Sequence, residues 1–373
     1  MTRKTIAFAS HVALIDGKEY DGIGNVVKET LNHITDDYMY VRHSMDGLLP
    51  SELVCYKNGG EQEHINMRVV SKPSPLRYIT EVYRTVRLFS KKISVDVYVG
   101  IDPLNAFAGV LLKRAGKINK TIFYTADYST KRFNNTLLNN IYHRIDRYCV
   151  NNSDEVWSVS TRICEVRRKM GLNDEKNIFV PNVPPENLVT KNLINHDPFE
   201  LITTGVIDNQ LDFEGIIQAV ADMSEEFPQL KLTIIGNGPK EDYLQKIAKD
   251  MKIDSKIDFT GRLSLQETIK RQSKAGIGLA LYTGVWGFNE YGDSTKCREF
   301  FSLGLPVIST DTHSTVEDIR KWDAGLIVNQ NKTDYENAIR AILQDYKKYS
   351  KNSNKAHEQF ADIHRKLFSK IIV

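Results

Sequence analysis

Short apolar segments alternate with helical patterns along most of this chain, and that alternation restricts the fold more than any other feature. In the first half, apolar stretches at 4–10, 95–101, 120–126 and 154–160 predict strands. Helical patterns lie at 22–34, 76–92, 103–114, 134–150 and 161–170. Strands that alternate with helices favour a parallel sheet covered on both faces. The first half is therefore predicted to be a doubly wound α/β domain.

The alternation stops once, at "VPNVPPENLVTKNLINHDP" (180–198), which contains four prolines. It then restarts, with predicted strands at 199–207, 230–238, 256–261, 275–282, 305–310 and 324–329. Helices are predicted between and after them, at 212–226, 239–251, 264–274, 295–303, 314–321 and 333–347. A chain of 373 residues exceeds one ordinary core. We therefore predict a first domain over 1–183, a linker over 184–198 and a second domain over 199–352. A final helix in 353–373 is expected to pack back on the first domain.

Composition excludes several classes of protein. Cys55, Cys149, Cys164 and Cys297 lie far apart without a CxxC pair, which argues against a disulfide framework or a zinc site and suits a reducing cytoplasm. No run of 18 apolar residues occurs, and the start of the chain is not typical of a signal peptide. Residues 1–190 hold 26 Lys and Arg against 21 Asp and Glu. This mild excess suits phosphate or an anionic membrane, although charged stretches are usually solvated surface. No nucleic-acid partner is expected.

The stretch "DSTKCREFFSLGLPVIST" (293–310) is the most informative motif. Ser294 or Thr295 can cap the predicted helix 295–303. Lys296 beside the free N–H groups of the first turn suits a phosphate, because the helix dipole and the cation act together. Glu299, one turn further on, can accept hydrogen bonds from the vicinal hydroxyls of a ribose. Together they indicate a nucleotide site; an ordinary capped helix with a Lys–Glu surface pair is the alternative.

"KCREFFSLGLPVIST" (296–310) resembles the donor site of GT-B glycosyltransferases, in particular the retaining enzymes of glycosyltransferase family 4. The resemblance implies two Rossmann-like domains that face a central cleft. It assigns the ribose to Glu299 and the diphosphate to Lys296, as in a Lys-x-x-Glu variant of the motif. The family commonly has a second Glu eight positions earlier. Here that position is Tyr291, and the neighbouring Glu290 becomes the candidate for binding the donor sugar.

The segment "GVIDNQLDFEG" (205–215) resembles the family's diphosphate-binding loop, which starts at Gly205, but here it has no Arg or Lys. By motif position, Lys296 and Arg262 are the nearest candidates to meet that charge. Arg262 and Leu263 follow the strand 256–261 at the turn where the family contacts the base. An exposed loop arginine is the alternative.

Two features of the first domain extend the predicted site. Gly22 and Gly24 in "DGIGN" stand where the family has a glycine-rich loop, and they would allow a phosphate or sugar to approach the backbone. Asp127 in "IFYTADYST" follows a strand, where the family often has His-Asp; here the residue before it is Ala126. We expect Asp127 to bind a sugar hydroxyl or to orient the acceptor, with a helix N-cap as the alternative. Asp127 and Lys296 are the predicted catalytic residues.

The stretch 76–93 predicts an amphipathic helix. One face would carry the apolar side chains and the other the charged ones: Leu76, Ile79, Val82, Tyr83, Val86, Phe89 and Ile93 against Arg77, Arg84, Arg87 and Lys91. Such a helix usually packs on its own sheet. Its basic face also suits an anionic membrane, and in that interpretation a cytoplasmic protein lies at the inner membrane face.

The resemblance implies an enzyme that moves a sugar from a UDP- or GDP-linked donor to a glycan or lipid-linked saccharide with retention, as in bacterial surface polysaccharide or glycoconjugate synthesis. No cofactor is expected besides the nucleotide sugar, and no metal, because the sequence has no DxD-type motif at the predicted site. Two alternatives remain. One is a sugar-nucleotide epimerase of the same fold, and the other is a non-catalytic nucleotide-binding subunit.

Overall fold

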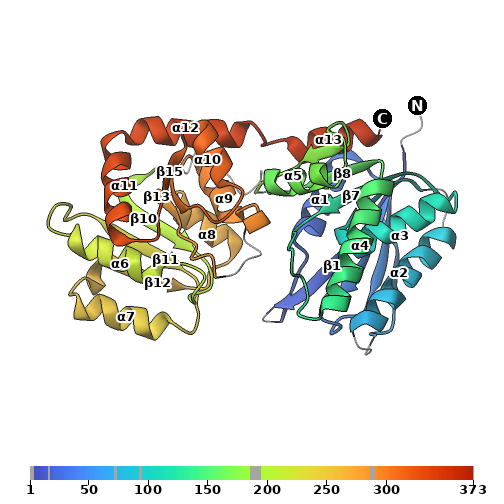
Figure 1. Cartoon of the computed structure of the whole chain (residues 1–373), viewed down its shortest axis with the longest axis horizontal. Helices are drawn as coiled ribbons and strands as arrows, with labels where there is room; N and C mark the ends of the chain where they lie inside the picture. Colours follow the sequence, from blue (N-terminus) through green and yellow to red (C-terminus); the bar gives the residue numbers. More distant parts are fainter. Residues whose placement is uncertain are drawn as a thin grey trace. The chain divides into compact units, whose positions relative to one another are not determined.

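The computed structural model describes residues 4–15, 17–70, 74–91, 95–184, 195–285 and 290–372, and these form two compact units (Figure 1). Unit 1 comprises Met1–Pro181 and Asp362–Val373, and unit 2 comprises Asn182–Ala361. The chain thus passes into unit 2 at 181–182 and returns at 361–362. Most of the predicted linker, residues 185–194, lies outside the described residues.

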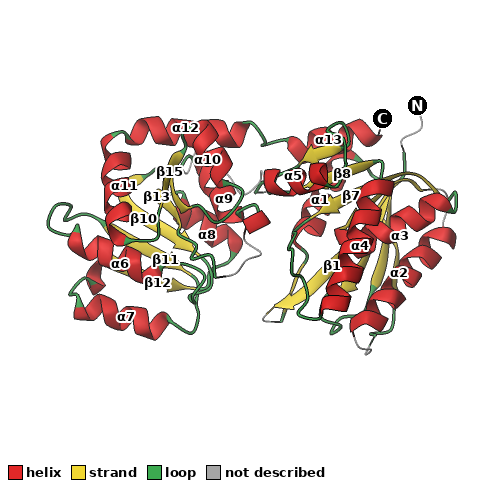
Figure 2. Cartoon of the chain, viewed as in Figure 1, coloured by secondary structure: helices red, strands yellow, loops and turns green. Residues whose placement is uncertain are grey.

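The described part of unit 1 forms a sheet with helices packed around it (Figure 2). The sheet has nine strands in the order β5-β4-β3-β1-β6-β7-β8-β9, and β2 pairs with β1. Its strands are β1 (Ile6–Ile15), β2 (Lys18–Tyr20), β3 (Tyr38–Ser44), β4 (Glu52–Lys57), β5 (Gly60–Asn66), β6 (Val95–Ile101), β7 (Ile118–Thr125), β8 (Glu155–Ser158) and β9 (Asn177–Phe179). From β3 to β9 through β1, neighbouring strands are parallel, as predicted.

The remaining pairings are antiparallel and were not predicted. β4 pairs with both β3 and β5, and β2 forms a hairpin with the end of β1. The first strand therefore runs to Ile15, well past the predicted end at residue 10. Polar residues fill β5, whose burial alternates between half-buried and exposed. Such an edge strand lacks the continuous apolar run that reveals a buried parallel strand.

The helices of unit 1 are α1 (Gly22–Ile34), α2 (Ser74–Lys91), α3 (Asp102–Arg114), α4 (Thr136–Asn152), α5 (Thr161–Lys169) and α13 (Ile363–Ile372). Across the sheet, the connection from β1 to β3 through α1 leads toward β5, whereas the connection from β6 to β7 through α3 leads toward β9. Right-handed crossovers therefore place α1 and α3 on opposite faces of the sheet. α2, α3 and α4 contact one another in that order, and α13 packs against α1.

The end of the chain differs from the prediction of one helix over 353–370. That stretch is divided between α12 (Tyr346–Glu358), which belongs to unit 2, and α13, which belongs to unit 1. In α13, His364 Nε2 lies 2.8 Å from the buried Tyr124 hydroxyl, and Phe368 packs edge-on against Trp157. α13 thus supplies part of the apolar core of unit 1.

Burial lowers the pKa of His364 to about 4, so the folded protein holds this imidazole neutral. An unfolded histidine titrates near 6.5, so the unfolded chain binds more protons between pH 6.5 and pH 4. We expect this group to lower the free energy of unfolding by about 2 kcal/mol between pH 7 and pH 5. Urea denaturation of wild type and His364→Gln at both pH values checks this. The exposed His33 on α1 gives the control His33→Gln. An equal pH dependence in wild type and His364→Gln would contradict the prediction.

The first half of α2 contradicts the predicted arrangement of its faces, whereas Val86 and Phe89 in the second half pack on the core as predicted. Arg77 is 7% exposed, donates hydrogen bonds to the carbonyls of Met45 and Asp46, and lies 3.5 Å from the buried Glu81. Leu76, Ile79 and Tyr83 instead face solvent. The reason is that the loop after β3 offers carbonyl acceptors to an inward-pointing guanidinium. Helical periodicity gives no information about those acceptors. Ile93 lies outside the described residues.

The described residues of unit 2 form a six-stranded, wholly parallel sheet with the order β12-β11-β10-β13-β14-β15. Its strands are β10 (Asp197–Thr204), β11 (Lys231–Ile235), β12 (Ile257–Gly261), β13 (Ala275–Ala280), β14 (Val307–Thr310) and β15 (Gly325–Val328). Its α-helices are α6 (Phe213–Asp222), α7 (Glu241–Asp250), α8 (Leu265–Gln272), α9 (Thr295–Leu303), α10 (Val316–Trp322), α11 (Lys332–Gln344) and α12, and the short 3-10 helix η3 (Asp254–Lys256) precedes β12. The strand order reverses between β10 and β13, where open α/β sheets bind ligands.

In the part of the chain that the structure describes, no helix is both long enough and apolar enough to cross a bilayer.

Candidate donor-binding site

Three glycines, Gly205, Gly236 and Gly261, lie together at the carboxyl ends of β10, β11 and β12 and form a glycine surface. The Gly205 N–H donates to the Ile235 carbonyl at 3.0 Å, and the Gly236 N–H donates to the Gly261 carbonyl at 2.9 Å. A Cβ on Gly236 would lie 1.9 Å from the Gly205 carbonyl oxygen, so no side chain fits there. Gly205 has a φ of 153°, which also favours glycine. This edge therefore leaves bare backbone beside the point where the strand order reverses.

α9 begins next to that glycine surface. The Ser294 side chain accepts from the Cys297 N–H and caps the helix, and Gly304 ends it with a φ of 73°. Ser294 is therefore the cap, and Thr295 is the exposed first residue of the helix. The free N–H groups of this first turn carry the partial positive charge that binds anions.

Lys296 brings a full positive charge to the same place. Its half-buried side chain lies over the Tyr282 ring, with Nζ 4.5 Å from the ring centroid. A Cβ on Gly205 would lie 3.5 Å from this Nζ, so the predicted residues Gly205 and Lys296 are brought together. Among the described residues, no carboxylate lies within 4.0 Å of the ammonium group. Burial lowers the pKa of Lys296 to about 8, against the opposing charges of Glu299 and Asp208. The site therefore contains a desolvated cation without an ion-pair partner.

Glu299 lies one turn further along α9, and its position is fixed from the neighbouring helix. Gln272, the last residue of α8, donates a hydrogen bond from Nε2 to Glu299 Oε2 at 2.9 Å. Burial raises the pKa of Glu299, while the Gln272 hydrogen bond and the Lys296 charge act in the opposite direction. The amide thus holds one oxygen of a carboxylate whose side chain stays half-buried.

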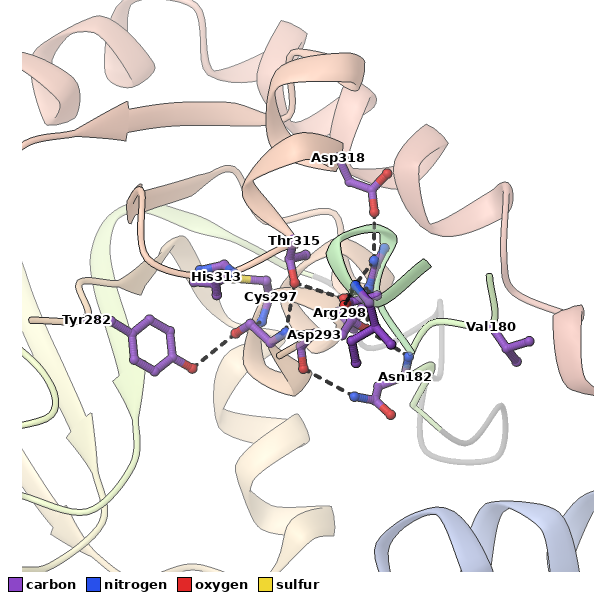
Figure 3. Close-up of polar contacts among 12 residues, drawn as sticks. Val180, Asn182, Tyr282, Asp293, Cys297, Arg298, His313, Thr315 and Asp318 are labelled. Carbon is purple, nitrogen blue, oxygen red and sulfur yellow. Dashed lines mark hydrogen bonds and ion pairs between the residues drawn. The ribbon is translucent and has the colours of Figure 1, made fainter. Parts of the chain in front are cut away.

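A buried ionic network holds the start of α9 in place (Figure 3). Arg298 donates from Nε and Nη2 to Asp293 at 2.8–3.1 Å, and from Nη2 to Asp318 at 2.6 Å. Asp293 also accepts from the Thr315 hydroxyl at 2.8 Å and from the Asn182 N–H at 2.7 Å. Because Asp293 precedes the cap residue Ser294, this network determines where the helix begins. It therefore positions Lys296 and Glu299.

A second set of contacts supports the aromatic side of the site. The Tyr282 hydroxyl shares a hydrogen bond of 3.2 Å with Ser294 Oγ, and its ring packs edge-on against His313 (Figure 3). His313 Nε2 in turn lies 2.9 Å from Ser309 Oγ at the end of β14. The ring under the Lys296 ammonium is thus held in one orientation by its hydroxyl and by its neighbour.

The other predicted residues of unit 2 lie around this centre. Arg262 and Leu263 follow β12, where Arg262 is exposed and Leu263 packs half-buried on the core. Glu290 is exposed in the segment before α9. In the segment 205–215, Glu214 of α6 accepts a hydrogen bond from Lys240 Nζ at 3.0 Å. This segment contributes no cation of its own. The roles of Arg262, Leu263, Glu290 and Thr295 stay predictions.

Unit 1 holds the remaining predicted residues, each at the carboxyl edge of its sheet. Gly22 starts α1, where a Cβ would make only an ordinary contact with the Tyr20 ring at 3.9 Å, whereas a Cβ on Gly24 would lie 2.1 Å from Asp21 Oδ1. The space above Gly24 is therefore used by the Asp21 carboxylate. Asp127 follows β7 and forms an ion pair with Arg132. Since Asn135 caps α4, the N-cap interpretation of Asp127 is wrong.

Sequence reasoning missed Asp102, which follows β6 as Asp127 follows β7. Asp102 has a φ of 68°, a left-handed conformation that is uncommon outside glycine. Burial and the nearby Asp127 raise its pKa to about 6. A polar residue directly after "VDVYVGI" (95–101) was the available signal, the same one that identified Asp127. Gln272 gave no such signal, because its partner Glu299 is 27 residues away on another helix. The main partner of Asp293, Arg298, is five residues away, but its other partners Asp318, Thr315 and Asn182 are joined to it only by the fold.

Known proteins resemble this chain in sequence and in fold. Residues 185–359 match the family model of the glycosyl transferases group 1. A curated relative is the GtfA subunit of the UDP-N-acetylglucosamine–peptide N-acetylglucosaminyltransferase of Streptococcus pneumoniae. It is 21% identical over 328 residues, which cover 80% of this chain and 60% of that protein. The chain therefore spans about 60% of the length of that relative.

Solved structures resemble the whole chain. A lipopolysaccharide outer core galactosyltransferase, WaaB, has a TM-score of 0.68 at 16% identity and covers 99% of both chains. HepE from Anabaena, solved in complex with UDP, has a TM-score of 0.62 at 11% identity and covers 98% of both. Pneumococcal GtfA in complex with UDP and GlcNAc has a TM-score of 0.58 at 16% identity and covers 96% of this chain and 68% of that one. The predicted GT-B fold is thus confirmed, and the match to the glycosyl transferases group 1 lies within unit 2.

Proposed function

We propose that this protein transfers a sugar from a UDP-sugar to a saccharide or lipid-linked saccharide acceptor, with retention of the anomeric configuration. The observation that carries the proposal is the unpaired, half-buried ammonium of Lys296 beside the capped end of α9 and the bare backbone at Gly205. A dianionic diphosphate needs a desolvated cation and free N–H groups together. We propose UDP as the nucleotide of the donor because HepE and GtfA, which resemble this chain, were solved in complex with UDP.

The proposed step moves charge toward Lys296. The acceptor hydroxyl oxygen attacks the anomeric carbon while the bond from that carbon to the β-phosphate oxygen breaks. The hydroxyl proton passes to the departing phosphate oxygen on the same face, which gives retention without a protein nucleophile. Negative charge grows on the diphosphate as the bond breaks. A fixed ammonium and fixed N–H dipoles stabilise that charge without needing to reorganise. No resident metal enters this step.

Residues outside the phosphate site have secondary roles in the proposal. Glu299, oriented by Gln272, accepts hydrogen bonds from the ribose hydroxyls. In the proposal, Arg262 and Leu263, which follow β12, contact the base, and Glu290 binds the donor sugar. Asp127 of unit 1 serves the acceptor. An acceptor belonging to bacterial surface polysaccharide synthesis fits this chemistry.

Glu299→Ala should weaken UDP binding about tenfold, because it removes a charged acceptor of two hydrogen bonds from ribose. The loss should be the same for UDP and for every UDP-sugar, since ribose is common to all. Thermal shifts with UDP-, GDP-, ADP- and dTDP-sugars measure binding, because a ligand that binds the folded state raises the apparent melting temperature. Glu241→Ala, in the first turn of α7, is the matched control.

The same panel separates the proposal from its alternatives. Transfer to an acceptor with UDP release supports it, whereas formation of an epimer from donor alone indicates an epimerase. UDP binding without any turnover indicates a binding subunit. If wild type and Glu299→Ala bind UDP equally, Glu299 has no contact with ribose.

A further inference from the structure

Tyr282 lies between the two elements that form the phosphate site, the segment after β10 and the start of α9. Its backbone pairs with Leu211 of that segment, and the Thr310 hydroxyl donates to its carbonyl at 2.7 Å. Its own hydroxyl shares a hydrogen bond of 3.2 Å with the α9 cap Ser294, and its ring packs edge-on against His313 (Figure 3). The ring is therefore fixed in place from four directions. Such anchoring alone is typical of a structural tyrosine.

The group over this ring is the Lys296 ammonium, whose Nζ lies 4.5 Å from the ring centroid. An ammonium within about 6 Å of a centroid is attracted by the negative charge of the ring face. Lys348 offers a comparison, because its Nζ lies 4.8 Å from the Tyr349 centroid but also pairs with Asp323 at 2.6 Å. Among the described residues, the Lys296 ammonium has no carboxylate within 4.0 Å, so there the ring acts without a carboxylate.

A ring differs from a carboxylate as a neighbour of this cation because it carries no net charge. A carboxylate in contact with Lys296 would neutralise the ammonium and would repel the phosphates of a donor. The ring attracts the ammonium and leaves its positive charge available to a ligand. This matters here because the segment 205–215, at the same edge of the sheet, contributes no cation. Burial raises the pKa of Tyr282, so its hydroxyl stays protonated and the ring stays neutral.

The ring also affects the charge state of Lys296. Burial lowers the pKa of Lys296 to about 8, and nearby negative charges act in the opposite direction. The titratable groups around Lys296 and Tyr282 come from three elements: Cys297 and Glu299 on α9, Asp208 after β10 and His313 after β14. The contact with the ring stabilises only the charged form of Lys296, so a weaker attraction by the ring lowers this pKa further.

We propose that Tyr282 is a positioning residue of the donor site. Its ring holds the Lys296 ammonium charged and close to Gly205, where the proposed function places the diphosphate, without neutralising it. The inference deepens the proposed function and rests on it, because support for Lys296 matters only if Lys296 meets the diphosphate. Tyr282 itself touches no reacting atom in this assignment.

The test changes the charge of the ring face without changing the shape of the ring. Position 282 of the full chain is replaced by phenylalanine and by its mono-, di- and trifluorinated analogues, since fluorine withdraws charge from the ring face. UDP binding is measured by calorimetry at pH 7, and circular dichroism checks the fold. Tyr282→Phe keeps the ring and should bind UDP within about twofold of wild type, whereas trifluorination should weaken binding about tenfold, in steps.

Two further measurements assign the effect to Lys296. In the Lys296→Ala background, the fluorinated series should show no trend. With Lys296 present, the pH above which UDP affinity falls should decrease from about 8 by about one pH unit in the trifluorinated protein. The profile of Lys296→Ala supplies the titration of UDP and of the other groups. Tyr243→Leu removes an exposed ring on α7 that lies 5.8 Å from Lys240 Nζ, and this matched control should bind UDP like wild type.

Equal UDP affinity along the fluorinated series would overturn the inference, even if Tyr282→Leu weakens binding, because packing alone would then explain Tyr282. A trend that persists in the Lys296→Ala background would also overturn it, since the ring would then act on another group. Failure of the proposed function gives a different result. If Lys296→Ala binds UDP like wild type, or if wild type binds no UDP, the diphosphate assignment is wrong, and the role of the ring fails with it.

Discussion

Lys296→Ala is expected to lower turnover of the UDP-sugar about a hundredfold while leaving the protein folded. The ammonium interacts more strongly with the departing diphosphate than with the bound donor, and such a charge-assisted contact in a dry site contributes about 3 kcal/mol. Substitution should not unfold the protein, since Lys296 has no carboxylate partner among the described residues to leave behind. Initial rates of UDP release give the turnover, and circular dichroism checks the fold. Lys332→Ala, which breaks an exposed pair with Asp222, is the control.

The pH dependence of Lys296 identifies its role further. Its pKa is lowered to about 8 by burial, so donor affinity should fall as pH rises through about 8, when the ammonium loses its charge. The free energy of unfolding of the unliganded protein should instead increase as the pH rises. Between pH 8 and the unfolded value near 10.4, the unfolded chain binds more protons, so stability rises with pH over that window. Lys296→Ala should lose both trends. A variant with wild-type turnover would refute the assignment.

Asp293→Ala is expected to lower the free energy of unfolding by about 3–5 kcal/mol, because it leaves the buried Arg298 guanidinium without its main partner. The substitution also removes the acceptor for the Thr315 hydroxyl and for the Asn182 N–H. Chemical denaturation measures the loss. Asp311→Ala breaks the exposed pair with Arg320 and should cost less than about 1 kcal/mol. Equal losses in the two variants would mean that the Asp293 network contributes no more than a surface pair.

Helix α9 shows how local signals determine an element completely. Its observed bounds, Thr295–Leu303, are the predicted ones. Ser294 caps its start and Gly304 ends it in a left-handed conformation, and both residues act within one turn of the helix. Lys296 and Glu299 were likewise accessible to sequence reasoning, because motif and helix position define them together.

Features that depend on distant partners were not predictable in this way. β4 and β5 pair antiparallel at an edge of the sheet, where half-exposed residues give no continuous apolar run. The buried position of Arg77 depends on carbonyls about thirty residues away. Gln272 reaches Glu299 from another helix, and Asp293 binds Asn182 across 111 residues. Each is a contact that only the assembled fold brings together.

Because the chain returns to unit 1 at 361–362, unit 1 is built from two separate segments and unit 2 from one. Unit 2 is one uninterrupted segment, Asn182–Ala361, and is in effect inserted into unit 1. Unit 1 is discontinuous, and a fragment ending at Pro181 would leave Trp157 and Tyr124 without the cover of Phe368 and His364. A chain that stops before α13 would therefore lack part of the core of the domain that is synthesised first. Completion of that domain must wait until α13 has been made, so unit 1 can finish folding only after all of unit 2 has been translated.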